Sequence, residues 1–442
     1  MINRGKRQVV ITGAGLVSPL GNSATGLLEA LSSGTSGVSE VEGAPPEHAS
    51  IKYAAAARDF SGHINDFGPL DTAQKKTIRK GLKVMCREIQ MGVAAAQLAL
   101  SNAGIEAGQL QPERSGVVFG SDYMLTRPEE YVEGIRNCMD GEKAFDFNRW
   151  GDEGLPKVTP LWLLKYLPNM PASHIAIYND LRGPSNSITH REASSNLSLA
   201  EAFCTIVRGS ADLMIAGATG TRVHPIRALH MAMQEEVALG DDPSRLSRPF
   251  DANRSGLVMG EGSGAVVLEW IEHARARNAL ILGEVIGYAS SSVLDRHSSA
   301  DRKQALLNVI RLSLRSAGVA PDQLGHINAH GLSTRRCDAE EAQAITAVFG
   351  DRDTPIPVVA AKGHFGNLGA GSGTIELIAS LMAMQRGTLF PVLNYETPDP
   401  ECPIAVVAQD GQVPTGDSCL NLNVTPQGQA AALLVRKFAP SA

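Results

Sequence analysis

The sequence of 442 residues is poor in cysteine, and its cysteines form none of the spacings typical of metal sites. There is no CxxC pair, and the six residues are scattered along the chain: Cys86, Cys138, Cys204, Cys337, Cys402 and Cys419. Isolated thiols of this kind are typical of buried residues in a reducing compartment. We therefore expect a cytoplasmic protein without a metal site.

An excess of positive charge is also absent, because 40 basic residues face 46 acidic ones and the formal net charge is −6. This balance lacks the basic surface that is typical of nucleic-acid-binding proteins. No apolar run is long enough to span a membrane. The short apolar run near the N-terminus contains glycine, lacks a cleavage site and is better explained as a strand than as a signal peptide. We expect no nucleic-acid partner and no membrane span.

The first glycine-rich turn lacks the third glycine of a dinucleotide-binding fingerprint. Gly13 and Gly15 follow a strand, but Ser18 stands where the third glycine belongs, and Pro19 interrupts any helix. No acidic residue follows a second strand at the distance that a ribose contact requires. We therefore reject a nicotinamide site and expect no cofactor.

What the sequence does contain is a repeated alternation of strands and helices. Hydrophobic residues make up 43% of the chain, which is an ordinary globular composition. The pattern runs to a helical stretch at 271–278 and then starts again, so we predict two pseudo-repeated α/β halves, residues 1–278 and 279–442. The expected strands of the second half are 281–289, 326–329, 357–360, 418–424 and 429–438, with helices at 302–317, 338–349 and 373–384.

Three segments of the first half are less regular. Residues 40–70 are polar and are predicted to be a surface excursion, whereas apolar periodicity predicts one long helix over Lys75–Ala103. That helix starts with a basic run, which is either a solvated face or a docking surface for an acidic partner. Residues Tyr123–Lys157 are irregular and acidic, as expected of a loop that faces a partner.

The centre of the chain is Gly183–Arg208, where a short strand and a bend precede a buried helix that starts near Ala193. A helix N-terminus presents free N–H groups and partial positive charge to a side chain at such a bend. Here the bend carries His190-Arg191-Glu192. Two interpretations stay open: a solvated turn in which Glu192 complements the helix dipole, or a reactive site.

Polar residues also follow two strands of the second half, where α/β proteins commonly place their sites. One group is Asn328–Gly331, which contains His330. The other is Ala361–Asn367, which contains Lys362 and His364 and precedes a glycine-rich helix start. From the pattern alone, His330 is as well explained by a structural role as by a catalytic one.

Several long motifs together resemble the β-ketoacyl-acyl-carrier-protein synthases of the elongating type, in the thiolase-fold superfamily. The motifs are VVITGAGLVSPLGN, LRGPSNSI, GSADLMIAGA, RPFDANRSGLVMGEGSGAVVLE, INAHGLST and DAEEAQAITAVFG. The resemblance implies an α/β thiolase-like fold of two βαβαβαββ halves in five layers, α-β-α-β-α, and usually a dimer. The family's activity is decarboxylative condensation of an acyl group with a malonyl unit on acyl carrier protein, in fatty acid or polyketide biosynthesis.

The resemblance also assigns site positions, and two of them depart from the family. The nucleophilic cysteine, seven residues after the serine of the GPS stretch, is replaced by Glu192, and the second histidine, five residues after the lysine, is replaced by Asn367. The positions that agree are the first histidine His330, the lysine Lys362, its glutamate partner Glu376, and the pantetheine-binding threonine Thr334. Thr425, a further substrate-binding candidate, lies in a stretch that replaces the family's gating loop.

These departures predict a non-condensing, chain-length-factor-like subunit that lacks the acyltransferase nucleophile. The alternative is an enzyme with altered chemistry on acyl- or malonyl-carrier protein, a decarboxylase or an unorthodox acyltransferase. The expected partners are acyl carrier protein and a second subunit, in a homodimer or a heterodimer with an intact ketosynthase. We expect Glu192 to face His330, to be ionised, and to raise the pKa of the imidazole. Glu192→Cys alone is expected to allow acylation.

Overall fold

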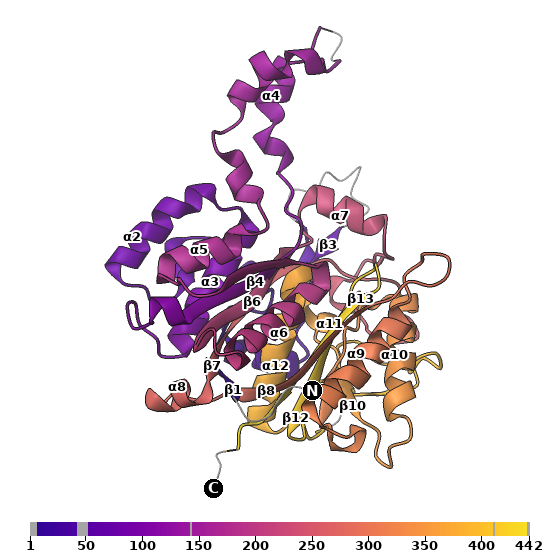
Figure 1. Cartoon of the computed structure of the whole chain (residues 1–442). Coiled ribbons are helices and arrows are strands. Elements are labelled where there is room, and N and C mark those ends of the chain that lie inside the picture. The colour runs from indigo at the N-terminus through magenta and orange to yellow at the C-terminus, as the bar shows by residue number, and fades with distance from the viewer. Residues whose placement is uncertain (1–6, 42–51, 142–143, 410–411, 440–442) are drawn as a thin grey trace.

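The computed structural model describes residues 7–41, 52–141, 144–409 and 412–439 (Figure 1). Its main sheet has the strand order β11-β10-β9-β12-β13-β8-β1-β7-β6-β4-β5. The strands of its first half are β1 (Val9–Val17), β4 (Ser115–Ser121), β5 (Ser185–Thr189), β6 (Leu213–Thr221) and β7 (Glu261–Trp270). Those of its second half are β8 (Gly283–Ser292), β9 (His326–Asn328), β10 (Pro357–Val359), β11 (Ala405–Val406), β12 (Ser418–Val424) and β13 (Gln429–Arg436). A separate pair joins β2 (Ser39–Glu40) to β3 (Tyr53–Ala54).

The two halves of the sheet have the same strand order. With the two-residue edge strand β11 left out, the order counted within each half is first, fifth, fourth, second and third strand. It holds in β1-β7-β6-β4-β5 and again in β8-β13-β12-β9-β10. The two first strands, β1 and β8, pair antiparallel where Val9–Ile11 meets Gly283–Val285. The halves are therefore joined by hydrogen bonds into one continuous sheet.

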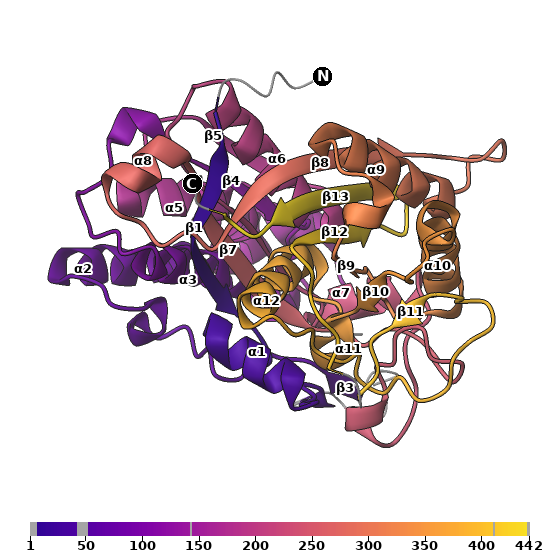
Figure 2. The same ribbon diagram turned by 90° about the horizontal axis from the view of Figure 1, so that it is seen from below.

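Helices cover both outer faces of this sheet and fill the space between the halves. Figure 2 shows one outer group, α2 (Thr72–Gly81), α3 (Arg87–Asn102) and α5 (Met170–Asn179), on one side and α9 (Arg302–Ala317) and α10 (Arg335–Phe349) on the other. Between them, α6 (Ser194–Val207) and α12 (Ser372–Arg386) contact strands of both halves. This is the five-layered, thiolase-like α/β arrangement. The shorter helices are α1 (Ala24–Ser32), α4 (Val132–Asn137), α7 (Pro225–Ala232), α8 (Ile271–Ala276) and α11 (Lys362–Phe365).

The paired glycines of β1 serve helix packing. A Cβ on Gly13 would lie 2.4 Å from the carbonyl oxygen of Ala99, and one on Gly15 would lie 2.2 Å from that of Ala95. Both carbonyls belong to α3, so only glycine lets this helix lie so close to the strand. The motif that imitates a dinucleotide fingerprint is thus explained by the core.

Two expectations for the first half are wrong. The helix predicted over Lys75–Ala103 is broken, because α2 ends at Gly81 and Met85 is extended before α3 begins. The Tyr178 hydroxyl lies where a Cβ of Gly81 would be, so tertiary contact fixes this break. The segment expected to be a surface excursion buries its apolar residues: Phe60, Ile64 and Phe67. Pro45 and Pro46, which also belong to the segment 40–70, lie outside the described residues.

The segment between β4 and α5 forms an arm around α4 that projects from the body (Figure 1). Aromatic contacts hold its base, with Tyr131 edge-on to Trp150 and Trp162. Large apolar side chains on it are exposed: Ile135, Phe145, Phe147, Leu155, Leu161 and Leu163. Among the residues described, no helix combines the length and the apolar character needed to cross a membrane.

Candidate active site

The bend after β5 points one carboxylate into the protein. A 3-10 turn, Arg191–Ala193, joins the strand to α6, and Arg191 has φ +49°. This left-handed conformation is costly for a residue with a Cβ and is found at sharp, functionally constrained bends. The turn is anchored by Ser194, whose hydroxyl accepts from the His190 backbone N–H at 2.8 Å. As a result Glu192 is 1% exposed, which excludes a solvated turn.

Glu192 is held by charged and polar groups from three parts of the chain. Arg222 Nη2 donates to its Oε1 at 2.7 Å, and Asn367 Nδ2 donates to the same oxygen at 3.2 Å. Arg191 Nε lies 3.6 Å from the other oxygen. Burial acts to raise the pKa of Glu192, but the charges of Arg222 and Arg191 outweigh it and hold the pKa well below its usual range. Glu192 is therefore ionised, as expected.

Sequence reasoning missed Arg222 and its second partner, Asp122. Arg222 Nη1 lies 2.7 Å from Asp122 Oδ2, and both side chains are at most 1% exposed. Asp122 directly follows β4 and Arg222 directly follows β6, and these strands are neighbours in the sheet. The signal was available in part, because each is an ionisable residue at the end of an apolar strand.

The second half contributes a separate buried network. Lys362 Nζ donates to Glu376 and, at 2.9 Å, to the backbone carbonyl of His330. Asn423 Nδ2 donates to the other Glu376 oxygen at 2.8 Å. Burial raises the pKa of Glu376, and the Lys362 charge opposes that rise. The structure thus brings Lys362, Glu376 and His330 together, in keeping with the positions that the family resemblance assigns.

His330 does not behave as expected. Its backbone N–H donates to Glu341 Oε1 at 2.7 Å, and its imidazole Nδ1 is buried without a hydrogen-bond partner. Burial lowers the pKa of His330 far below its usual value, and the Lys362 charge adds to the decrease. Glu192 acts in the opposite direction and is outweighed. The expectation of a raised pKa for His330 is therefore wrong, and the imidazole is neutral.

Asn367, rather than His364, reaches Glu192. The Asn367 side chain is fixed on its other side, since its Oδ1 accepts from the Gly369 N–H at 2.9 Å. His364 is buried elsewhere, with Nδ1 3.0 Å from the Thr35 carbonyl and Nε2 2.9 Å from the Pro391 carbonyl. His364 therefore has a structural environment and leaves the second-histidine position to Asn367.

The two predicted substrate-binding threonines lie in different surroundings. Thr334 is buried with an unpartnered hydroxyl and lines a surface cavity of about 600 Å³. Gln234, Arg302 and Pro426 line the same cavity. Thr425 lies in the β12–β13 turn, where its hydroxyl accepts from the Gln429 N–H at 3.2 Å. The cavity is thus a candidate entrance at Thr334, whereas Thr425 is used by the turn.

Arg191 stands between this cavity and Glu192. Its Nη1 donates to Gln234 at 2.7 Å and to Gln427 at 3.1 Å, so it ties the bend to both the cavity wall and the β12–β13 turn. Its Nε faces Glu192. The side chain is only 12% exposed. Arg191 therefore links Glu192 to Gln234 in the wall of this cavity.

Known proteins match the chain along nearly its whole length. Residues 6–274 match the model of the beta-ketoacyl synthase N-terminal domain, and residues 282–396 match that of its C-terminal domain. The 3-oxoacyl-[acyl-carrier-protein] synthase 2 of Coxiella burnetii is 32% identical over 92% of this chain and 93% of the relative. The protein of the same name from Synechocystis is 30% identical over 99% of this chain and 100% of the relative.

Solved structures agree with these matches. A beta-ketoacyl synthase from Burkholderia phymatum superposes with a TM-score of 0.82 at 27% identity, covering 98% of this chain and 100% of that one. The ishigamide ketosynthase/chain length factor superposes with a TM-score of 0.83 at 25% identity and the same coverage. The chain belongs to the β-ketoacyl synthase family.

Proposed function

We propose that the protein is a non-condensing β-ketoacyl synthase homologue, a chain-length-factor-like subunit in fatty acid or polyketide biosynthesis. The observation that carries the proposal is the ionised Glu192, ion-paired with Arg222 at the position of the nucleophile. A thiolate takes an acyl group as a thioester. A carboxylate of lowered pKa is a weak nucleophile, and the anhydride it would form is short-lived in water. The chain therefore lacks the first step of condensation.

An enzyme with altered chemistry, a malonyl-carrier decarboxylase or an unorthodox acyltransferase, is less well supported. A malonyl carboxylate beside Glu192 would meet a like charge unless Glu192 were protonated. Arg222 and Arg191 both favour the ionised form. The ion pair thus favours the non-condensing role.

The exposed face of α2 is the candidate docking surface for acyl carrier protein. Its end and the turn after it expose several basic side chains: Lys76, Arg79, Lys80 and Lys83. Helix α2 lies at the edge of the molecule, away from the second half (Figure 1). Concentrated positive charge attracts an acidic partner and accelerates its association at low salt. The carrier and this protein would meet each other in the cytoplasm.

Strand β5 is the candidate subunit contact. It closes one end of the sheet and pairs, among the described strands, with β4 alone. Its first residues, Ser185 and Asn186, are exposed. An open strand edge offers unpaired N–H and C=O groups to a strand of another chain. The partner would be an intact ketosynthase in a heterodimer, or a second copy in a homodimer.

The proposal is tested by assaying the chain alone and with an intact ketosynthase encoded beside it. Alone, it should release no carbon dioxide from malonyl-carrier protein and show no acyl adduct by intact mass after incubation with acyl-carrier protein. Light scattering of the co-expressed chains should give the mass of a dimer. The control variant is His297→Ala, at an exposed position. The proposal would be contradicted if the chain released carbon dioxide, and if this activity were lost in His330→Ala but kept in His297→Ala.

A further inference from the structure

A run of buried charges extends from Glu192 through the interior of the first half of the chain. Arg222 bridges Glu192 and Asp122 at 2.7 Å each. Further along, Arg227 Nη1 lies 2.7 Å from Glu88 and donates to the Thr221 carbonyl at 2.9 Å. Arg222 is 0% and Arg227 1% exposed. Buried arginines of this kind persist only where carboxylates compensate them.

Tyr123 and Thr221 link the two ion pairs of Arg222 to the Arg227–Glu88 ion pair. Tyr123 follows Asp122 in the chain, and the Arg227 guanidinium lies 4.8 Å from the centre of the Tyr123 ring. The Thr221 backbone N–H donates to Glu88 at 3.2 Å, immediately before Arg222. The charges therefore form one continuous cluster, the buried charge cluster, whose members are Glu192, Arg222, Asp122, Arg227 and Glu88.

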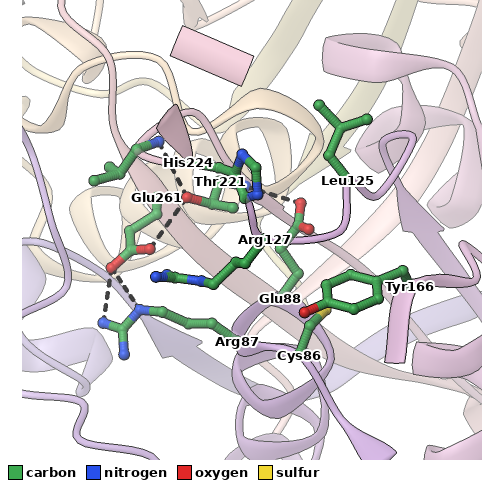
Figure 3. Close-up of a pocket in the computed structure, with 10 residues that line it drawn as sticks. Cys86, Arg87, Glu88, Leu125, Arg127, Tyr166, Thr221, His224 and Glu261 are labelled. Carbon is green, nitrogen blue, oxygen red and sulfur yellow. Dashed lines mark hydrogen bonds and ion pairs between the residues drawn. The ribbon is translucent and has the colours of Figure 1, made fainter. Parts of the chain in front are cut away.

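The far end of the buried charge cluster borders a cavity of about 270 Å³ (Figure 3). Glu88 lines it together with the Arg87–Glu261 ion pair, whose N–O distance is 2.7 Å. Arg127 and His224 also line it, as Figure 3 shows. Charged groups gain nothing from contact with hydrocarbon and lose hydration when it covers them. The cavity also has apolar lining from Leu125 and Tyr166, whereas the buried charge cluster offers an acyl chain only charged groups.

The side chain at position 192 is enclosed by the groups that hold it. Arg222 and Asn367 contact one oxygen, and Arg191 faces the other. A long substituent on this residue would have to displace Arg222 from Asp122 or Arg191 from Gln234. Displacement of Arg222 would separate a buried ion pair, and such separations are strongly unfavourable.

We propose that Arg222 excludes a long acyl chain from position 192, whereas the shorter side chain of Glu192→Cys leaves room for a small group. The inference rests on the proposed function for one consequence: in a heterodimer, the growing chain would not be attached to position 192 of this subunit. Glu192→Cys, expected from the sequence to allow acylation, leaves Arg222 in place. We now expect that variant to accept only small electrophiles.

The experiment uses the thiol of Glu192→Cys in the full-length chain as a reporter. The variant is treated with iodoacetamide and with N-dodecyl iodoacetamide, and labelling of residue 192 is followed by peptide mass, with the unsubstituted chain as background for the native cysteines. Labelling by iodoacetamide should be at least tenfold faster than labelling by the dodecyl reagent. The combined variant Glu192→Cys/Arg222→Ala/Asp122→Asn should reduce that ratio to below threefold.

Two further variants keep the test decisive. Glu192→Cys/Arg277→Ala breaks a remote ion pair with Glu269 and should keep the tenfold ratio. Glu192→Cys/Arg222→Lys keeps the charge opposite Asp122 if the combined variant fails to fold, and should give an intermediate ratio. Equal labelling by both reagents in Glu192→Cys alone would overturn the inference. That outcome would leave the proposed function standing, because carbon dioxide release and subunit pairing are measured independently.

Discussion

The two halves of the chain contribute different groups to the candidate active site around Glu192. The first half supplies both the cation and the anions of an ion-pair cluster, in which Arg222 lies between Glu192 and Asp122. The second half supplies a lysine network in which Lys362 joins Glu376 to the His330 carbonyl. The residues of this second network are those that the family resemblance assigns, whereas the cluster of the first half includes Glu192, at the position that the resemblance assigns to the nucleophile. The first half thus departs from the family's pattern at Glu192, while the second half keeps the lysine network.

This difference shows that the frame of the second half does not depend on the nucleophile. The side-chain hydrogen bonds of Lys362 and Glu376 among the described residues all lie within the second half. The Lys362 backbone carbonyl does accept from the first half, from the Ser247 hydroxyl at 2.9 Å. Asn367 Nδ2 donates directly from the second half to Glu192. Variants of each half should therefore have separable effects on stability, which the following measurements examine.

Removal of the central arginine should have the largest effect. Arg222→Met leaves Glu192 and Asp122 buried without their shared cation, and the loss of one partner of a buried ion pair costs about 3–5 kcal/mol of unfolding free energy. Urea denaturation measures the change. The matched control is Arg222→Met/Glu192→Gln/Asp122→Asn, which removes all three charges and should recover most of the loss. A single variant as stable as the unchanged chain would show that the cluster carries little of the first half's stability.

The corresponding change in the second half is Lys362→Met. It leaves Glu376 without its cation and removes a donor to the His330 carbonyl, so we expect a loss of about 3 kcal/mol. Because burial already raises the pKa of Glu376, protonation relieves part of the penalty. Lys362→Met/Glu376→Gln should recover stability. Non-additivity between Lys362→Met and Arg222→Met in a double-mutant cycle would contradict the separation of the halves.

The pH dependence of stability should distinguish His330 from Glu192. The pKa of His330 is lowered in the folded protein, so below about pH 6.5 the unfolded chain binds the extra proton and stability falls as pH decreases, by up to about 1.4 kcal/mol per pH unit. The pKa of Glu192 is also lowered in the folded protein. Its contribution to the free energy of unfolding is therefore fully present above about pH 4.3, the ordinary pKa of a glutamate. This contribution is lost as pH falls from there through the pKa of Glu192 in the folded protein. His330→Gln should flatten the difference between pH 5 and 6.5.

The pH profile of His330→Gln is compared with that of the unchanged chain because Glu341, which accepts from the His330 backbone N–H, changes stability with pH in the opposite direction. Burial raises the pKa of Glu341 to about 7, so its share of stability falls as pH rises from about 4.3 to 7. The control is His297→Gln at an exposed position. An unchanged pH profile in His330→Gln would mean that His330 is protonated in the folded protein.

The smallest effect is expected at the hydrogen bond from Asn367 to Glu192. Asn367→Ala removes a donor at 3.2 Å from Glu192 and an acceptor for the Gly369 N–H, and should cost about 1 kcal/mol of unfolding free energy. Asn367→His, which restores the family's residue, tests whether an imidazole can replace both contacts. A loss as large as that of Arg222→Met would mean that Asn367, rather than Arg222, fixes Glu192.

Much of the fold was predictable where local signals are strong. Helix α9 and strand β12 have the predicted bounds, because Asp301 caps the helix, Gly318 ends it, and β12 is buried on both faces. The break between α2 and α3 was not, since it depends on contact between Gly81 and Tyr178, far apart in sequence.

The candidate site was predictable only in part. Family motifs located Glu192, His330 and Asn367, and the structure joins Asn367 to Glu192 by a hydrogen bond. Arg222 and Asp122 were missed because their pairing depends on β6 lying beside β4, and strand adjacency is not encoded in any local pattern. The pKa of His330 was misjudged for a similar reason: burial and Lys362, both tertiary effects, outweigh the charge of Glu192.

The position of β1 has a consequence for folding kinetics. Val9 is opposite Trp270 in one neighbouring strand and Val285 in the other, so β1 pairs, among the described strands, with segments more than 240 residues later. Contacts this distant in sequence slow folding, because loop closure must precede any stabilising pairing. During synthesis the apolar β1 therefore stays unpaired until β7, the last strand of the first half, has left the ribosome. Until then the exposed strand makes the nascent chain prone to aggregation.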